Sequence, residues 1–443
     1  MAVMLLSSVA LGGAGASCSS SDDERAPGAT PDAGDDASSP RVEGEPSDSG
    51  IDVTIRDAAV PPFDGGPLPV VCASAPCATS LVTTLPSSDT DRAEGYCALL
   101  DDGTVACWGA NGAGQLGRGN DGGTFDDALP ARVGGLSNVV GLAHTCALDA
   151  SGGVWCWGTG PYLRNDAGAR TTERTPLRLP LPPARSVGVG LEVGCAVVDT
   201  GVLCWGKNTN AQLAPLASVA ATTLLPPQAI ALPSGAPARD LLVGKATIAV
   251  REDGVAVSWG ANPPLARESS LYPDPYPTPI DLGGVTSMDM TNENGCLTAG
   301  GIGYCWGTGT TGYGALNRAL PEPVVAPEPL VRIATTMLRR YTVLGKTFVL
   351  PRRWCGVGAS GTVYCWGINP NGQAGDGTKE TAYDAVKVEG LPAPAADVRA
   401  LTDSTCALLT NGKVYCWGSN YYGQLGDGKL KVRSLVPVEV VLP

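Results

Sequence analysis

Short apolar runs in this chain recur in pairs around a turn that contains glycine. In one such unit, an apolar run at 406–409 and a second at 414–417 flank the turn Thr410-Asn411-Gly412. Apolar and β-branched residues on both sides of a short glycine turn are typical of a β-hairpin. Gly (59 residues) and Pro (37 residues) are abundant, and both interrupt helices. The pattern therefore predicts an all-β protein assembled from hairpins.

The hairpin unit occurs seven times. A Trp-Gly pair ends each copy, beginning at positions 108, 157, 205, 259, 306, 366 and 417, so the spacings are 49, 48, 54, 47, 60 and 51 residues. A period near 50 residues indicates an array of supersecondary units, none of which can bury its own faces alone. The recurrent Trp beside Gly is interpreted as a packing residue between neighbouring units.

The turns predict the pairing register of the hairpins. Five units leave a three-residue loop with Gly in third place, as in Asp101-Asp102-Gly103, which suits a type I turn with a G1 bulge. The other two units leave two-residue loops, Asp199-Thr200 and Gly300-Gly301. The shorter loop preserves the same pairing of the flanking residues.

This register places Cys opposite Cys in six units. Opposed residues of antiparallel strands lie within disulfide range, so we expect the bonds 97–107, 146–156, 195–204, 296–305, 355–365 and 406–416, the paired residues being Cys97, Cys107, Cys146, Cys156, Cys195, Cys204, Cys296, Cys305, Cys355, Cys365, Cys406 and Cys416. Buried free thiols are the alternative. Ile248 and Ser258 replace both partners in the fourth unit, and Cys72 and Cys77 are expected to close a small loop. Such pairing indicates an oxidising compartment.

The residues around the hairpins resemble the regulator of chromosome condensation (RCC1) repeat family. The run Leu142-Ala143-His144-Thr145-Cys146-Ala147-Leu148 is similar to the start of its repeat, and Trp417-Gly418-Ser419-Asn420-Tyr421-Tyr422-Gly423-Gln424-Leu425-Gly426 to its end. The resemblance implies a seven-bladed β-propeller of four-stranded blades, which we assign to residues 71–443. The strand near 437–441 is expected to share a blade with the first hairpin and so close the ring.

The first seventy residues differ in kind from the repeats. Residues 1–18 resemble a signal peptide whose Cys18 follows small residues and is the candidate lipidation site; a plain secretory signal is the alternative. Residues 19–70 are rich in Ser, Asp, Pro and Gly and are expected to be a disordered acidic tether. We therefore expect a protein secreted across the inner membrane as an outer-membrane or cell-surface lipoprotein, with no other membrane attachment.

Charge and composition narrow the classes of function. The net charge is −13, and twelve Asp or Glu against three Arg place −9 of it in residues 18–70, so a nucleic-acid partner is not expected. The single His, His144, rules out a His-based triad or a His-rich metal site. We expect neither catalytic residues nor a metal nor a cofactor. A binding scaffold is favoured, a glycan-binding or cell-wall-binding propeller is the alternative, and a polysaccharide hydrolase or lyase with two carboxylates is third.

One interval of the repeat is longer than the others. The 60 residues from Trp306 to Trp366 include a basic stretch, 336–353, without Asp or Glu. Insertions in propellers emerge as loops on a face. The candidate contacts with an unknown and anionic partner (an acidic protein, an anionic glycan or lipid headgroups) are Arg339, Arg340, Tyr341, Lys346, Arg352 and Arg353. A longer solvated loop or a strand extension is the alternative. We expect the protein to be a monomer.

Overall fold

Four-stranded antiparallel sheets are the repeating unit of the folded chain. A computed structural model describes residues 63, 65–119, 125–161, 171–308, 318–337, 339–343, 346–350 and 353–443. Blades 1 to 3 consist of β1 (Ala78–Thr83), β2 (Gly95–Leu100), β3 (Val105–Gly109), β4 (Asp127–Arg132); β5 (Val139–Ala143), β6 (Cys146–Asp149), β7 (Val154–Gly160), β8 (Thr171–Arg178); and β9 (Ala184–Val189), β10 (Val193–Val198), β11 (Gly201–Lys207), β12 (Leu224–Ile230). Blades 4 and 5 consist of β13 (Ala238–Val243), β14 (Ala246–Arg251), β15 (Ala256–Gly260), β16 (Asp274–Pro279); and β17 (Val285–Met290), β18 (Asn294–Ala299), β19 (Ile302–Gly307), β20 (Arg318–Val324). Blades 6 and 7 consist of β21 (Leu330–Thr335), β24 (Trp354–Gly358), β25 (Val363–Gly367), β26 (Ala382–Lys387); and β27 (Ala395–Ala400), β28 (Ser404–Leu409), β29 (Val414–Gly418), β30 (Ser434–Glu439).

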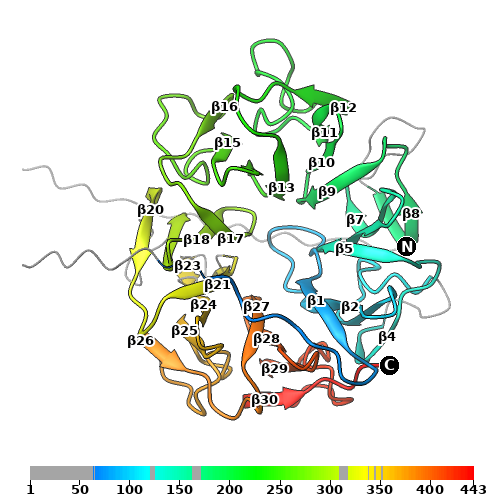
Figure 1. Ribbon diagram of the computed structural model, residues 1–443, viewed down its shortest axis with the longest axis vertical. Coiled ribbons are helices and arrows are strands. Elements are labelled where there is room, and N and C mark those ends of the chain that lie inside the picture. The colour runs from blue at the N-terminus through cyan, green and yellow to red at the C-terminus, as the bar shows by residue number, and fades with distance from the viewer. Residues whose placement is uncertain are drawn as a thin grey trace, which may run out of the picture. The chain divides into compact units, whose positions relative to one another are not determined.

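The seven blades form a closed ring. The first strand of each blade contacts the first strands of both neighbouring blades, and the contact of β27 with β1 completes the circle (Figure 1). The predicted seven-bladed β-propeller is therefore confirmed. The apolar side chains lie between adjacent blades, because each sheet has two faces to cover and only its neighbours to cover them.

The central hairpin of each blade has the predicted register. Cys97 pairs with Cys107 between β2 and β3, and the other five Cys pairs are placed in the same way. All six pairs are bonded, with Cα–Cα distances of 4.0 to 4.1 Å, and Cys72 is bonded to Cys77. The disulfide prediction is confirmed over the alternative of free thiols. In blade 4, Ile248 lies opposite Ser258 without a bond.

In six of the seven blades, the recurrent Trp joins the blade to the one before it. Its ring is buried between the blades, and its Nε1–H donates to a main-chain carbonyl of the preceding blade over 2.7 to 3.0 Å. These bonds run from Trp108 to Gln424, Trp157 to Gln115, Trp205 to Pro161, Trp259 to Gln212, Trp306 to Pro264 and Trp417 to Gln373. The acceptor is often the Gln of the Gly-Gln-Leu motif, so the two halves of the repeat motif recognise each other across the seam.

The ring closes in a way that differs from the sequence expectation. β1 belongs to blade 1 with β2, and β30 belongs to blade 7 with β29, so the expected shared blade is wrong. The strand 78–83 supplies the first strand of blade 1, so this blade needs no strand from the C-terminal end. Each blade is instead a contiguous stretch of chain.

An N-terminal strap, consisting of Phe63 and residues 65–77, lies across the turns of the last blades. Phe63 packs against the core of blades 6 and 7 and beside Gly301, Leu68 lies beside Gly361, and the Val71 N–H donates to the Thr410 carbonyl over 2.7 Å. Figure 1 shows the strap in dark blue, ending at β1. Apolar side chains that precede residue 71, such as Phe63 and Val70, are thus packed against the propeller. Cys18 and most of the tether lie outside the described residues.

A helix that crosses a membrane must be long and apolar. Nothing in the described strands, turns and loops amounts to a helix that could cross a bilayer.

Candidate functional site

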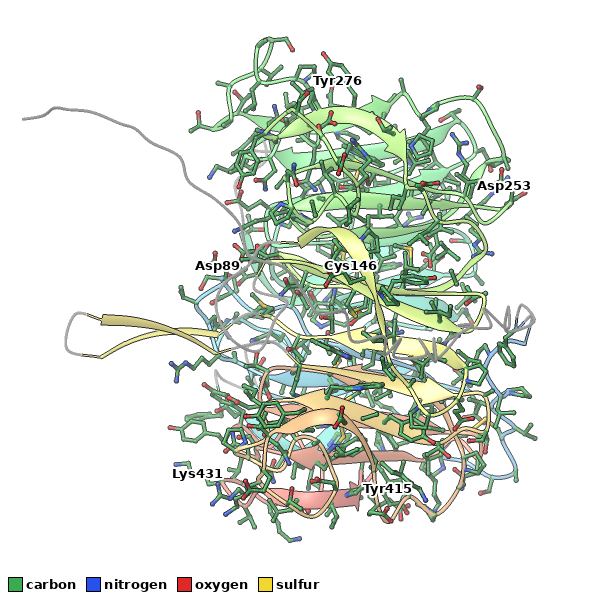
Figure 2. All side chains as sticks on the ribbon, turned by 90° about the vertical axis from the view of Figure 1, so that its left-hand side faces the viewer. Asp89, Cys146, Asp253, Tyr276, Tyr415 and Lys431 are labelled. Atoms are coloured by element: carbon green, nitrogen blue, oxygen red, sulfur yellow. A yellow bond between two sulfur atoms is a disulfide. The ribbon has the colours of Figure 1, made fainter. Side chains whose placement is uncertain are left out.

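The two ends of the ring carry different connections. The hairpin turns between second and third strands lie on one face, the back face, which the strap also crosses. The connections between first and second strands lie on the opposite face, the mouth face. Figure 2 shows Asp89 of the β1–β2 connection and Asp253 of a hairpin turn on opposite sides of the molecule. Features on the mouth face vary most in length between blades.

A hairpin is inserted on the mouth face of blade 6. Between β21 and β24 the chain forms β22 (Arg339–Val343) and β23 (Lys346–Leu350), a two-stranded sheet of its own. Its register pairs Tyr341 with Phe348. Figure 2 shows this hairpin, in yellow, extending away from the blades on the side of Asp89. The extra sequence predicted to emerge on a face is thus a hairpin.

The predicted contact residues are divided by the structure. Arg339, Arg340 and Tyr341 lie in β22, and Lys346 begins β23. Arg352 lies outside the described residues. The hairpin therefore brings four of the six candidates together.

Arg353 was predicted to contact a partner, and the structure contradicts this. It is 1% exposed and its guanidinium donates to the main-chain carbonyls of Leu401 (2.6 Å), Thr402 (3.2 Å), Gln373 (3.1 Å) and Ser404. Burial lowers its pKa to about 10. The residue ties blade 6 to blade 7, because the insertion ends immediately before it and the chain has re-entered the blade. It is not available to a partner.

A cavity of about 150 Å³ opens at the centre of the mouth face. Its wall comes from the first-to-second-strand connections of several blades, chiefly 84–94, 190–191, 290–293 and 400–403. A second cavity of about 340 Å³ lies between the first strands and shares His144, Val243 and Asp289 with it, so the two are consecutive parts of one channel.

The connection 84–94 carries a buried carboxylate. Glu94 is 5% exposed and accepts hydrogen bonds from the Asp403 N–H (2.7 Å), the Ser404 hydroxyl (2.6 Å) and Gln424 Nε2 (3.2 Å). Burial, and next the charge of Asp403, raise its pKa to about 7, although the three donors act in the opposite direction. Glu94 therefore joins blade 1 to blade 7 at the rim of the channel. Sequence reasoning missed it; the available signal was the length of this connection.

The channel wall holds the single histidine. His144 occupies the turn between β5 and β6 at φ 51°, and its Nδ1 is 3.1 Å from both the carbonyl and the hydroxyl oxygen of Thr83. Burial lowers the pKa of His144, and burial raises that of Asp289 even though Arg399 lies 3.5 Å from it. His144 thus connects the β5–β6 turn to the end of β1.

The described residues show neither a metal-binding cluster nor an aromatic rim around the channel. No group of three or more of their His, Cys, Asp or Glu side chains is placed to hold a metal ion. Nor does any Trp, Tyr or Phe among them line the channel mouth, where a glycan would need an aromatic surface. The arrangement can bind through its mouth face and its inserted hairpin.

Comparison with known proteins shows which repeat family this chain is similar to. The family described as "Regulator of chromosome condensation (RCC1) repeat" matches residues 402–424. The ultraviolet-B receptor UVR8 of Arabidopsis thaliana is 27% identical over 362 residues, which are 78% of this chain and 68% of the receptor. The E3 ubiquitin-protein ligase HERC2 of Homo sapiens is 26% identical over 64% of this chain but only 6% of the ligase.

Solved structures share the fold. Prp20p of Saccharomyces cerevisiae, described with its binding to Gsp1p and histones, superposes with a TM-score of 0.58 at 18% identity, covering 76% of this chain and 85% of Prp20p. Human WBSCR16 gives a TM-score of 0.61 at 16% identity over 77% and 95% of the two chains. These matches confirm the resemblance to RCC1 repeats and the propeller fold.

Proposed function

We propose that this member of the RCC1 repeat family is a non-enzymatic binding scaffold that captures a protein partner through its mouth face. The observation that carries the proposal is the inserted hairpin β22–β23. It is a sheet separate from every blade and extends beyond them (Figure 2). An isolated two-stranded hairpin is marginally stable in water, so an extended one is best explained by a contact that it makes.

The sequence of the hairpin sets the chemistry of the partner. Arg339, Arg340 and Lys346 give it three cationic residues and no acidic one. Such a surface favours an acidic protein partner and speeds encounter with it. The rest of residues 71–443 holds 31 Asp or Glu against 24 Lys or Arg, so this positive charge is local to the insertion.

We further propose that the scaffold is held at the cell surface by Cys18. Seven disulfides support an oxidising compartment. The strap begins on the back face, so an N-terminal tether would leave the mouth face directed away from its anchor. Radiolabelled palmitate should appear in the wild-type protein and be absent from Cys18→Ser.

Affinity capture from envelope extracts, scored by mass spectrometry, tests the binding function. The triple variant Arg339→Ala, Arg340→Ala and Lys346→Ala should lose the captured partner at least about tenfold, because three interface charges are removed. Arg132→Ala with Lys413→Ala is the matched control, since both exposed cations lie outside the hairpin in ion pairs. Equal capture by the triple variant and the wild type would refute the role of the hairpin.

A further inference from the structure

The channel mouth carries acidic side chains that play no part in the proposed interaction of the hairpin. Its wall includes six carboxylates, Asp89, Asp91, Glu94, Asp289, Glu293 and Asp403, and a single arginine, Arg92. On a propeller that is otherwise nearly neutral, this is a local concentration of negative charge. Walls of low dielectric focus such a field into the opening.

These carboxylates differ in the hydrogen bonds and ion pairs that they make. Asp91 accepts from the Ser87 and Ala93 N–H groups of its own loop, each over 2.9 Å, and Glu293 is paired with Lys245. Asp89 is exposed at the rim and makes no hydrogen bond or ion pair with any described residue. Asp403 is contacted by Asn371 Nδ2 over 3.2 Å and raises the pKa of Glu94 by its charge. Among the described residues of the rim, Asp89 is thus a carboxylate without a paired cation.

The remainder of the wall is mainly apolar. Leu85, Leu191 and Leu401 lie in it together with Met290 and Met337, whose flexible thioethers adapt to different ligand shapes. The cavity of about 150 Å³ is of the size that holds a benzene molecule in other proteins, so it fits one side chain and not a folded domain.

Two buried hydroxyls in this wall are an independent sign of a missing ligand. Thr84 and Thr335 are 2% and 0% exposed, and neither Oγ1 has a hydrogen-bond partner in the described structure. A buried polar group without a partner costs about 1–3 kcal/mol, and native structures contain few of them. A ligand with hydrogen-bond donors could supply the missing partners.

We propose that the channel mouth binds a guanidinium or ammonium group carried on an aliphatic stem, as in an arginine or lysine side chain. The stem packs on the leucines and methionines, and the cationic head lies among Asp89, Glu94 and Asp403. An anion would be repelled by these carboxylates. The site is separate from the basic hairpin, so either can fail without the other.

Methionine-methyl NMR tests this binding directly. The chain has five Met residues, of which Met337 lines only the mouth, Met290 lines both cavities and Met288 lines only the deeper cavity. The probe is the blocked peptide Gly-Gly-Arg-Gly-Gly, compared with peptides carrying Lys, citrulline or Glu in the central position. The Arg and Lys peptides should shift the Met290 and Met337 signals. Citrulline, a neutral analogue of Arg, should bind at least about tenfold more weakly, and Glu should cause no shift.

Substitutions of the rim carboxylates test the same proposal in a second way. Asp89→Asn with Asp403→Asn should weaken the Arg peptide about tenfold, while Asp199→Asn with Asp253→Asn, on back-face turns, should leave it unchanged. A melting curve checks that each variant is folded.

Free n-butylguanidine distinguishes the source of the ligand. Binding as tight as that of the peptide indicates a small amine-type ligand, and weaker binding indicates a polypeptide. The proposal is overturned if the Arg and Lys peptides shift neither methyl at about 10 mM, where a millimolar site is nearly saturated, or if the Glu peptide binds equally well.

Discussion

At the scale of single residues, the blades are joined by a small number of repeated polar contacts. The indole N–H of Trp108 donates to the Gln424 carbonyl over 3.0 Å, and the Trp residues of five other blades make the equivalent bond. A typical hydrogen bond adds only about 1 kcal/mol, but an unpaired buried carbonyl costs about 1–3 kcal/mol. The repeated Trp therefore has two roles. Its N–H satisfies a carbonyl of the preceding blade, and its ring fills the space between the two blades.

Glu94 makes the stability of the closing seam depend on pH. Its folded pKa, about 7, is above its usual 4.5, so its favourable contribution is complete below pH 4.5 and is lost as the pH rises through 7. The difference of about 2.5 units corresponds to about 3 kcal/mol. Relative to Glu94→Gln, the wild type should therefore lose about 3 kcal/mol of unfolding free energy between pH 4.5 and pH 8, measured by urea denaturation.

Glu439→Gln is the control for this prediction. The Lys413 ammonium lowers the pKa of Glu439, so that its contribution is present at high pH and is lost as the pH falls. The two variants should thus shift the pH profile in opposite directions. Parallel profiles for the wild type and Glu94→Gln would show that Glu94 is already ionised at pH 5.

At the scale of elements, the hairpin of β28 and β29 represents the unit from which the ring is built. Cys406 and Cys416 lie directly opposite each other, with Cα atoms 4.0 Å apart, and are completely buried. A bond here closes a loop of eleven residues, so it fixes register more than it links distant parts of the chain. Blade 4 shows that the fold tolerates its absence, because Ile248 packs in the same position.

Removing one such bond should have a measurable cost. By the chain-entropy estimate, a loop of this length contributes about 3 kcal/mol. Cys406→Ala with Cys416→Ala should lower the unfolding free energy by about that amount in urea under non-oxidising and non-reducing conditions. Faster hydrogen exchange should be concentrated in β28 and β29. An unchanged urea midpoint would show that packing alone sets the register.

At the scale of the whole molecule, closure depends on the strap and on the seam between blades 7 and 1. Val71 donates to the Thr410 carbonyl, the Ala78 N–H donates to the Gly412 carbonyl over 2.9 Å, and the Tyr96 hydroxyl is 3.0 Å from that of Ser404. These contacts replace the strand exchange that a shared blade would provide. The first and last blades are therefore held by loops and side chains.

Loosening the strap should weaken this seam selectively. Phe63→Ala with Leu68→Ala and Val70→Ala removes its apolar contacts, and each truncation of a partly buried side chain should cost about 1 kcal/mol or more. Hydrogen exchange should increase in β28 and in residues 94–109. β10 and β11 of blade 3 are the internal reference. Equal acceleration in blade 3 would indicate general destabilisation instead.

The sequence allowed the local structure to be predicted far better than the site. Gly103, with φ 74°, and the Cys97–Cys107 pair follow from spacing alone, because turn length fixes the register of a hairpin. Glu94 and Arg353 could not be placed in this way. Glu94 meets Asp403, Ser404 and Gln424 of the last blade only when the ring is closed. Arg353, directly before β24 of blade 6, reaches the Leu401 and Ser404 carbonyls only when blades 6 and 7 are packed together.

Each blade is formed by consecutive strands, and this has a consequence for the gene. Duplicating or deleting one unit of about fifty codons would add or remove a complete blade and leave every other blade intact. A propeller with a blade shared between its ends would have to conserve both ends to survive such an event. Blade number in proteins built like this one is therefore free to change by whole-unit recombination, limited by whether the strap and the 7–1 seam can still meet.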